Sequence, residues 1–276
     1  MGIDVGGQST KLGVVDARGN ILYQSVISSL QRELSSYVDD LTAAIKDLIK
    51  KAENDGEIKG IGIGAPNGNY YKGTIEFAPN LKWAYDENDK PMVIFFAKMI
   101  RDIVGIPVAI TNDANAAAVG EMTYGIAKGM KDFIMITLGT GVGSGIVING
   151  NIVYGHDGFA GELGHTTTIR GGRQCNCGRK GCLETYTSAT GVARTAREFL
   201  AERKDKSLLR SLDPEKITSK DIYDAATKGD KLAIEIFHYT GRIMGEAFAN
   251  FVAFSAPEAI ILFGGLARSK EFLTES

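Results

Sequence analysis

The sequence predicts a mixed α/β protein made of two related lobes. Short runs rich in β-branched residues alternate with stretches whose apolar residues recur every three or four positions. A hairpin with a glycine-rich turn, followed by helix and strand, occurs twice, so a plain doubly wound parallel sheet fits less well. We therefore expect a smaller α/β lobe over residues 1–110 and a larger one over residues 111–276.

The first lobe is expected to begin with a hairpin and a third strand. Apolar runs predict strands at 3–5, 11–15, 21–23 and 58–64. Apolar residues at helical spacing predict an amphipathic helix over 38–52. A second helix is expected from about Pro91 to Val104, because proline is favoured in the first turn of a helix.

The second lobe is expected to repeat this plan and to add helices. Strands are predicted at 108–111, 133–138, 145–148 and 259–263. Helices are predicted at 114–124, 191–204, 219–227 and 231–253. Residues 267–276 resemble a helix that has barely begun, and we expect both ends of the chain to be truncated.

Composition argues against nucleic-acid and membrane partners. The formal net charge of −2 produces no strong field toward either. The longest apolar stretch, Ala247–Leu262, is interrupted by polar residues and a proline, so we do not expect it to span a bilayer. With 23% charged residues and no charged leader before the first strand, the chain is typical of a cytoplasmic globular protein.

Three glycine-rich turns lie at the ends of predicted strands. Each one alone is typical of a tight hairpin. Neither the Walker A pattern nor the full dinucleotide fingerprint occurs, since position 144 is serine. Three such turns beside hydroxyl groups together favour a nucleotide held between the lobes, with Asp4 on a hydrated Mg²⁺. The candidate nucleotide-binding residues are Asp4, Gly6, Gly7, Ser9, Thr10, Lys11, Gly139, Thr140, Gly141, Gly143, Gly264 and Gly265.

Asp113 lies where a predicted strand becomes a helix. One interpretation is a helix N-cap, for which aspartate is among the preferred residues. The other is a general base at the mouth of the cleft between the lobes, because phosphoryl transfer to an alcohol needs an acceptor for the hydroxyl proton. The helix dipole favours the ionised carboxylate, so one residue can serve both roles.

All three cysteines of the chain lie in one short loop. Cys175, Cys177 and Cys182 follow C-x-C-x₄-C spacing, and His165 precedes them by ten residues. Three thiolates and one imidazole form the closed tetrahedral set typical of structural Zn²⁺. Three unrelated thiols are the other interpretation, and His156 is an alternative fourth ligand by spacing alone.

Two carboxylates flank this cluster, within a zinc loop that we place at residues 161–184. A metal would hold Glu162 and Glu184 rigidly, and fixed acceptors suit a polyhydroxylated ligand whose hydroxyls donate to them. The alternative is that each is a solvated loop residue.

Together these motifs resemble the ROK family of sugar kinases and repressors, in particular its glucokinase branch, over nearly the whole chain. Residues 2–11 and 138–145 are similar to the two phosphate motifs of the family, and Gly264-Gly265 to its adenosine-side turn. The first turn departs from the family after Gly7, where Thr-Asn is usual. Residues 161–165 with 175–184 resemble the highly specific zinc signature, which implies His165 as the fourth ligand.

The resemblance implies a fold and a set of roles. The implied fold is the two-lobed actin-like ATPase fold, built on ribonuclease-H-like sheets, with the active site in the cleft between the lobes. Asp113 would accept the proton of the sugar's 6-hydroxyl, and His165 would bind zinc through one ring nitrogen and face the sugar with the other. The implied sugar-binding residues are Asn80, Asn112, Glu162, His165 and Glu184.

The predicted function is ATP-dependent phosphorylation of a hexose at its 6-hydroxyl, with ATP, Mg²⁺ and structural Zn²⁺ as cofactors. Glucose is the first choice, because residues 188–191 resemble those of glucokinases. N-acetylglucosamine, N-acetylmannosamine, fructose and allose are alternative substrates, and a sugar-sensing repressor with a separate DNA-binding domain is an alternative function. The family resemblance also implies a homodimer.

Overall fold

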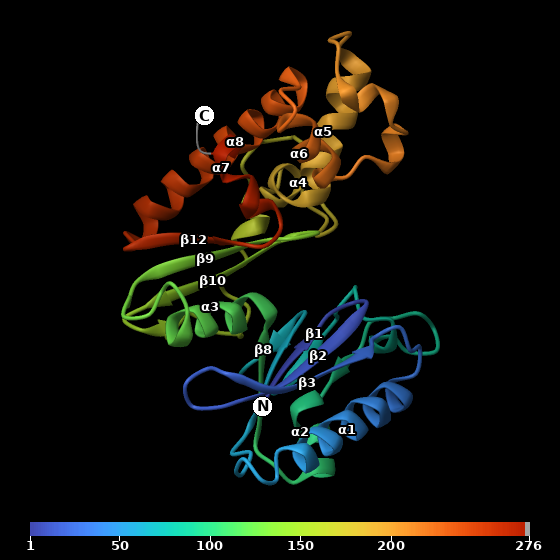
Figure 1. The fold of residues 1–276 in the computed structure, drawn as a ribbon, viewed down its shortest axis with the longest axis vertical. Coiled ribbons are helices and arrows are strands. Elements are labelled where there is room, and N and C mark those ends of the chain that lie inside the picture. Colours follow the sequence, from blue (N-terminus) through green and yellow to red (C-terminus); the bar gives the residue numbers. More distant parts are fainter. Residues whose placement is uncertain (274–276) are drawn as a thin grey trace. The chain divides into compact units, whose positions relative to one another are not determined.

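The computed structural model describes residues 1–273, which form two compact units (Figure 1). Unit 1 comprises residues 1–129 and 152–161, and unit 2 comprises residues 130–151 and 162–273. The expected division after residue 110 differs from this, because strand β8 (Val108–Asn112) pairs in parallel with β4 (Ile61–Ala65) and completes the sheet of unit 1.

Unit 1 is built on a five-stranded sheet of order β3-β2-β1-β4-β8. The first three strands are β1 (Gly2–Val5), β2 (Ser9–Val15) and β3 (Ile21–Ser28). They pair antiparallel, whereas β4 runs parallel to β1 and to β8. A three-stranded sheet consists of β5 (Gly68–Asn69), β6 (Thr74–Glu76) and β7 (Val93–Ile94).

Three helices cover the two faces of the five-stranded sheet. The helices α1 (Leu34–Lys51) and α2 (Phe96–Val104) lie on one face, and α3 (Asp113–Tyr124) lies on the other (Figure 1). On α1, Leu41, Ile45 and Leu48 are fully buried, as the helical spacing predicted. The helix expected from Pro91 begins only at Phe96, because the preceding residues pair with β6 as strand β7.

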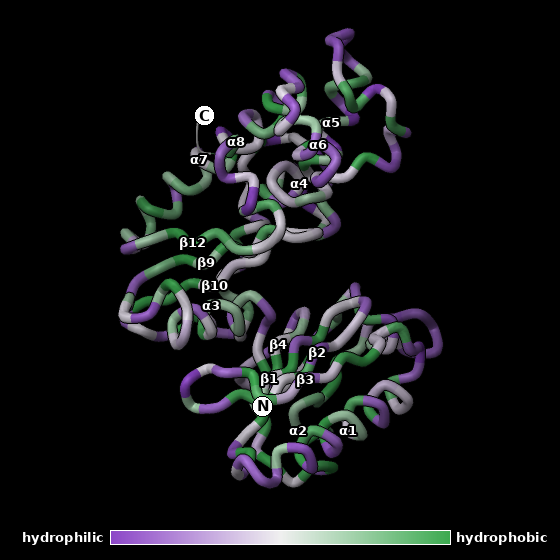
Figure 2. The backbone as a smooth tube through the Cα atoms, viewed as in Figure 1, coloured by the Kyte–Doolittle hydropathy of each residue, from purple (hydrophilic) through white to green (hydrophobic). Residues whose placement is uncertain are grey.

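Unit 2 is built on a four-stranded sheet of order β11-β10-β9-β12. The strands are β9 (Phe133–Leu138), β10 (Val142–Ile148), β11 (Asn151–Ile152) and β12 (Ala259–Phe263). A glycine turn joins β9 to antiparallel β10, as another joins β1 to β2, and β12 runs parallel to β9. The predicted α/β class and the repeated plan are therefore confirmed. The central strands of this sheet are strongly hydrophobic (Figure 2).

The helices of unit 2 are α4 (Glu184–Thr187), α5 (Ala189–Glu202), α6 (Ser219–Ala226), α7 (Lys231–Ser255) and α8 (Lys270–Leu273). Short 3₁₀ turns occur at Leu163–His165, Leu208–Ser211, Pro214–Lys216 and Leu266–Ser269, and in unit 1 at Lys82–Ala84. Across residues 1–273, no helix combines the length and the apolar character that a bilayer crossing requires.

Candidate active site

The first glycine turn joins β1 to β2 and lies against a distant backbone segment. The Gly6 N–H donates to the Ser9 carbonyl oxygen at 3.1 Å and closes the turn. A Cβ at Gly7 would lie 2.8 Å from the carbonyl oxygen of Asn80. Because only glycine permits this approach, the sequence places the predicted sugar residue Asn80 beside the predicted phosphate turn.

Thr10 faces the core and not this turn. It is fully buried, and its Oγ1 lies 2.8 Å from Ser29 Oγ and 2.6 Å from Tyr37 Oη. Burial raises the pKa of Tyr37 to about 12, so its hydroxyl keeps its proton and remains part of this network. The prediction that the Thr10 hydroxyl binds phosphate was therefore wrong, because turning it outward would take a hydrogen-bond partner from two buried hydroxyls.

Asp113 is the first residue of α3, directly after the carboxyl end of β8. The N-cap of the helix is Asn112, whose Oδ1 accepts the N–H of Ala114 at 2.8 Å and that of Asn115 at 3.4 Å. The capping role considered for Asp113 thus belongs to its neighbour. Asp113 Oδ1 accepts the Ala114 N–H at 2.8 Å, which orients the carboxylate without consuming its second oxygen.

The electrostatic surroundings of Asp113 suit a general base. The residue as a whole is exposed to solvent, yet the surroundings of its carboxyl raise its pKa above the ordinary value, through burial first and the negative charge of Asp4 second. The Ala114 N–H acts against them. Asp4 lies on β1 directly opposite Lys11 on β2. A raised pKa increases the affinity of the carboxylate for a hydroxyl proton.

The second and third glycine turns meet at the end of β9, within unit 2. The Gly139 N–H donates to the Gly141 carbonyl oxygen at 3.0 Å, which closes the second turn. Gly264 has φ of +108°, and a Cβ there would lie 2.4 Å from the carbonyl oxygen of Leu138. Gly264 and Gly265, which follow β12, are therefore neighbours of the second turn, whereas Gly143 lies inside β10.

Helix α5 begins against the second turn. The Ala189 N–H donates to the Gly139 carbonyl oxygen at 2.9 Å, and Thr190 Oγ1 donates to that of Thr140 at 2.8 Å. Ser188 caps the helix by accepting the Gly191 N–H at 3.0 Å. These bonds fix the turn through two of its carbonyl groups.

The four predicted zinc ligands converge on one point. The ligand atoms of His165, Cys175, Cys177 and Cys182 all lie within 4.8 Å of one another. The Sγ atoms of Cys177 and Cys182 are 3.6 Å apart, and His165 Nδ1 is 3.6 Å from Cys175 Sγ. A tetrahedral site with Zn–S bonds of about 2.3 Å requires sulfur–sulfur separations of roughly 3.8 Å, so the donor set fits zinc.

Two of the three thiols in this cluster need a nearby cation to ionise, whereas burial is outweighed at the third by hydrogen bonds, which lower the pKa of Cys177. Burial raises the pKa of Cys175 and raises that of Cys182 to about 12. A divalent metal displaces those protons, because the thiolate is the ligand.

The segment that carries His165 packs against the start of β10. The Leu163 N–H donates to Ser144 Oγ at 2.9 Å, and Ser144 is buried. A Cβ at Gly164 would lie 2.2 Å from the Val142 carbonyl oxygen, so glycine is needed for this contact. Glu162 directly precedes this segment and is exposed.

Glu184 begins α4 and reaches the same part of β10. Its Oε2 accepts the Val142 N–H at 2.9 Å, and its Oε1 lies 3.9 Å from Cys175 Sγ. The Glu184 carboxylate thus lies between the second glycine turn and the cysteine cluster.

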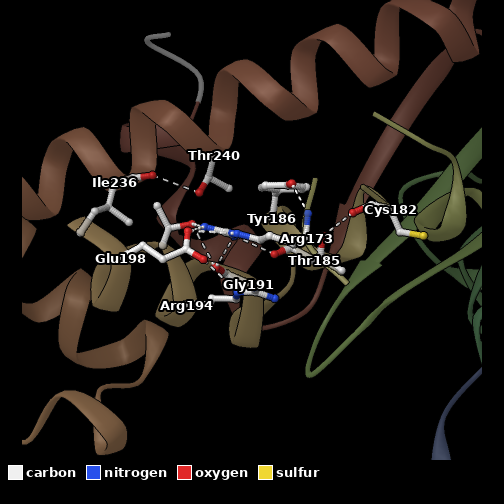
Figure 3. Close-up of polar contacts among 10 residues, drawn as sticks. Arg173, Cys182, Thr185, Tyr186, Gly191, Arg194, Glu198, Ile236 and Thr240 are labelled. Atoms are coloured by element: carbon white, nitrogen blue, oxygen red, sulfur yellow. Dashed lines mark hydrogen bonds and ion pairs between the residues drawn. The ribbon is translucent and has the colours of Figure 1, made fainter. Parts of the chain in front are cut away.

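A buried arginine that sequence reasoning missed connects the zinc loop to the neighbouring helices (Figure 3). Arg173 donates to the Thr185 carbonyl oxygen at 2.7 Å, to Thr195 Oγ1 at 2.9 Å and to the Glu198 carboxylate. Its guanidinium lies 4.4 Å from the ring centre of Tyr186. The loop is thereby attached to both α4 and α5.

Each unit gathers part of the predicted site. Unit 1 brings together the first glycine turn, Asn80, Asn112 and Asp113. Unit 2 brings together the second and third glycine turns, the His-Cys cluster and Glu184.

Comparison with known proteins assigns the family. Residues 1–276 match the ROK family as a whole. The chain belongs to the ROK family. A glucokinase from Halalkalibacterium halodurans is 37% identical over 99% of this chain and 82% of its own length.

Solved structures of this family show the same fold. A ROK family glucokinase from Streptomyces griseus, in complex with glucose and AMPPNP, has a TM-score of 0.78 and 33% identity, over 99% of this chain and 85% of that one. A ROK family transcriptional regulator, a homologue of the E. coli MLC protein, has a TM-score of 0.87 and 25% identity, over 99% of this chain and 67% of that one. The predicted two-lobed actin-like ATPase fold is confirmed.

Proposed function

We propose that this ROK protein transfers the γ-phosphoryl group of ATP to the 6-hydroxyl of a hexose, with glucose as the first substrate. One observation carries the proposal: Asp113 stands at the carboxyl end of parallel strand β8, on the first turn of α3, with its pKa raised by burial. The glucokinases at 33–37% identity support the choice of reaction and of sugar.

In this reaction the 6-hydroxyl oxygen attacks the γ-phosphorus, and the bond to the β,γ-bridging oxygen breaks to release ADP. The hydroxyl proton passes to the Asp113 carboxylate. The N–H groups of the glycine turns bind the phosphates, and Ser9 and Lys11 add a hydroxyl and a cation. Asp4, on β1, would hold a hydrated Mg²⁺, which would neutralise charge on the transferred group.

The hexose would be held by groups of complementary hydrogen-bonding character. Glu162 and Glu184 accept from sugar hydroxyls, whereas the side-chain amides of Asn80 and Asn112 can donate to sugar oxygens. Because His165 Nδ1 faces the cysteine cluster, its Nε2 remains for the sugar. Zinc bound by His165 and the three cysteines would supply rigidity to this loop.

The carboxylate role of Asp113 is tested by Asp113→Asn in a coupled assay that follows ADP release across a panel of sugars. We expect turnover to fall by about 10²–10⁴-fold, the usual contribution of a general base, while hexose binding persists. The matched control is Asp102→Asn, a surface aspartate paired with Lys98 and Arg101, which should retain full turnover. Full turnover in Asp113→Asn would exclude the mechanism.

The same panel decides among hexoses. N-acetylglucosamine, N-acetylmannosamine, fructose and allose compete with glucose as acceptors, and the largest kcat/KM identifies the substrate. The likeness to a ROK transcriptional regulator supports a second candidate, a sugar-responsive repressor. Retention of the full gene product on duplex DNA, released by sugar, would favour it. The predicted homodimer would be checked by light scattering.

A further inference from the structure

The second glycine turn approaches the Glu184 carboxylate more closely than a side chain at position 141 would allow. A Cβ at Gly141 would lie 2.4 Å from Glu184 Oε2 and 3.3 Å from its Cδ. The φ of Gly141 lies outside the left-handed region, so its backbone conformation does not itself require glycine. With Glu184 in its observed position, there is no room for a side chain at position 141.

The next residue holds that carboxylate. The Val142 N–H donates to Glu184 Oε2 at 2.9 Å, a bond from a backbone amide to a charged acceptor. On its other side, the Val142 carbonyl oxygen packs against Gly164, one residue before His165. The start of β10 thus contacts both segments that carry predicted sugar ligands of unit 2.

This arrangement leaves the two oxygens of Glu184 with different tasks. Oε2 is occupied by the Val142 N–H, whereas Oε1 points toward the cysteine cluster, 3.9 Å from Cys175 Sγ. A carboxylate has about four lone-pair sites, so an anchored Glu184 still accepts from a sugar hydroxyl. Without the anchor, the side chain would have to be ordered at the moment of binding, which lowers affinity.

We propose that Gly141 is a positioning residue for hexose recognition: it leaves the space in which the Val142 N–H holds the Glu184 carboxylate for the sugar. The proposal rests on the proposed role of Glu184 as a sugar ligand. It assigns a part in sugar affinity to a turn whose other predicted partner is the nucleotide.

The test is Gly141→Ala in the full chain, with KM for glucose and KM for ATP measured separately. The added methyl displaces the end of a flexible side chain, so the fold is retained, while the Val142–Glu184 bond is lost. We expect the glucose KM to rise by about 10-fold or more, since a hydrogen bond to a charged group corresponds to a factor of roughly 10–100.

The matched comparison is Gly139→Ala, in the same turn. A Cβ at Gly139 meets nothing within 4 Å, and its φ is also outside the left-handed region. This variant should leave the glucose KM within about twofold, whatever it does to the KM for ATP, since no bond of the Glu184 carboxylate is touched. An equal rise in glucose KM for both alanine variants would overturn the proposal.

A double-mutant cycle with Glu184→Ala separates the positioning role of Gly141 from the role of Glu184 as a sugar ligand. If Gly141 acts through Glu184, Gly141→Ala has no further effect on glucose KM once Glu184 is alanine. Additive effects would refute the positioning role. If Glu184→Ala alone leaves glucose binding unchanged, the proposed sugar contact fails instead. Glu184→Asp, which withdraws the carboxylate from Val142 and keeps the charge, should reproduce the rise seen with Gly141→Ala.

Discussion

Replacement of Arg173 by methionine tests whether the buried guanidinium stabilises the zinc loop. The side chain of Arg173 is only 6% exposed, and methionine fills a similar volume without any donor. The change removes every hydrogen bond from this side chain to Thr185, Gly191, Thr195 and Glu198. The loop then loses its attachment to α4 and to the first turns of α5.

The expected cost follows from burial on the two sides of the network. Removing one partner of a fully buried ion pair costs about 3–5 kcal/mol. The Glu198 side chain is 39% exposed, so water and Arg194 compensate part of the loss, and we expect about 3 kcal/mol. Burial acts to raise the pKa of Glu198, but the two arginines outweigh it and lower this pKa. The stabilisation is therefore present above the ordinary pKa of a glutamate and is lost as the pH falls through the lowered pKa of Glu198.

The assay is hydrogen–deuterium exchange on peptides from α4 and α5. A loss of about 3 kcal/mol accelerates exchange there by roughly two orders of magnitude, since 1.4 kcal/mol is a factor of ten. Trp83, the single tryptophan, is buried in unit 1, and its fluorescence reports independently that this unit remains folded.

Arg194→Met is the matched control, because Arg194 pairs with the same carboxylate. Its side chain is 42% exposed, and such a pair contributes about 0.5 kcal/mol or less. Equal acceleration of exchange by the two variants, or none in Arg173→Met, would refute the reasoning that burial of Arg173 sets its contribution.

Three further predictions follow from the site. Because burial raises the pKa of Asp113, kcat/KM should fall as the pH drops through that raised value. If the pH dependence of kcat/KM is the same in Asp113→Asn as in the wild type, the prediction is wrong. Because its pKa is raised, the ionised Asp113 carboxylate destabilises the folded protein at neutral pH. Asp113→Asn should therefore have an equal or higher Tm than the wild type at neutral pH, and this gain should vanish in acid, where the carboxyl is protonated; differential scanning calorimetry measures both. Chelation should release the bound metal and speed the hydrogen–deuterium exchange of residues 162–187, and Cys182→Ser should have the same effect. Metal analysis of the untreated protein should find one mole of zinc per chain, and its absence would contradict the prediction.

Another prediction concerns the buried hydroxyl network. Thr10→Val should lower the free energy of unfolding by about 1–2 kcal/mol, because the hydroxyls of Ser29 and Tyr37 lose a partner. Its effect on the KM for ATP should be smaller than that of Ser9→Ala, and the reverse order in steady-state kinetics would restore Thr10 to the phosphate turn.

The sequence was sufficient for the three cysteines, whose spacing predicted one metal-binding cluster. Spacing left His156 and His165 as alternatives for the fourth ligand, and the family resemblance selected His165, which lies beside the cysteines. The helical periodicity of α1 likewise predicted its buried face. Thr10 was misassigned although its signal was present: it alternates with Leu12 and Val14, which share the buried face of β2.

Other features depend on contacts between distant parts of the chain. The extent of unit 1 could not be predicted, because β8 joins it by pairing with β4. The two parallel strands are separated by a long crossover connection, so no local pattern links them. Arg173 gives no local signal, since an arginine in a loop is usually exposed. The contact of Glu184 with Val142 also requires the folded hairpin.

The order of the chain in unit 1 has a consequence for synthesis on the ribosome. Asn69 is fully buried, and its Nδ2 donates to the carbonyl oxygen of Asp157 at 2.8 Å, from the segment 152–161. This acceptor emerges only after residues 130–151, the first hairpin of unit 2, have been translated. The nascent amino-terminal unit therefore lacks this hydrogen-bond acceptor until its late segment leaves the exit tunnel, so its fold is completed only after part of unit 2 has been made.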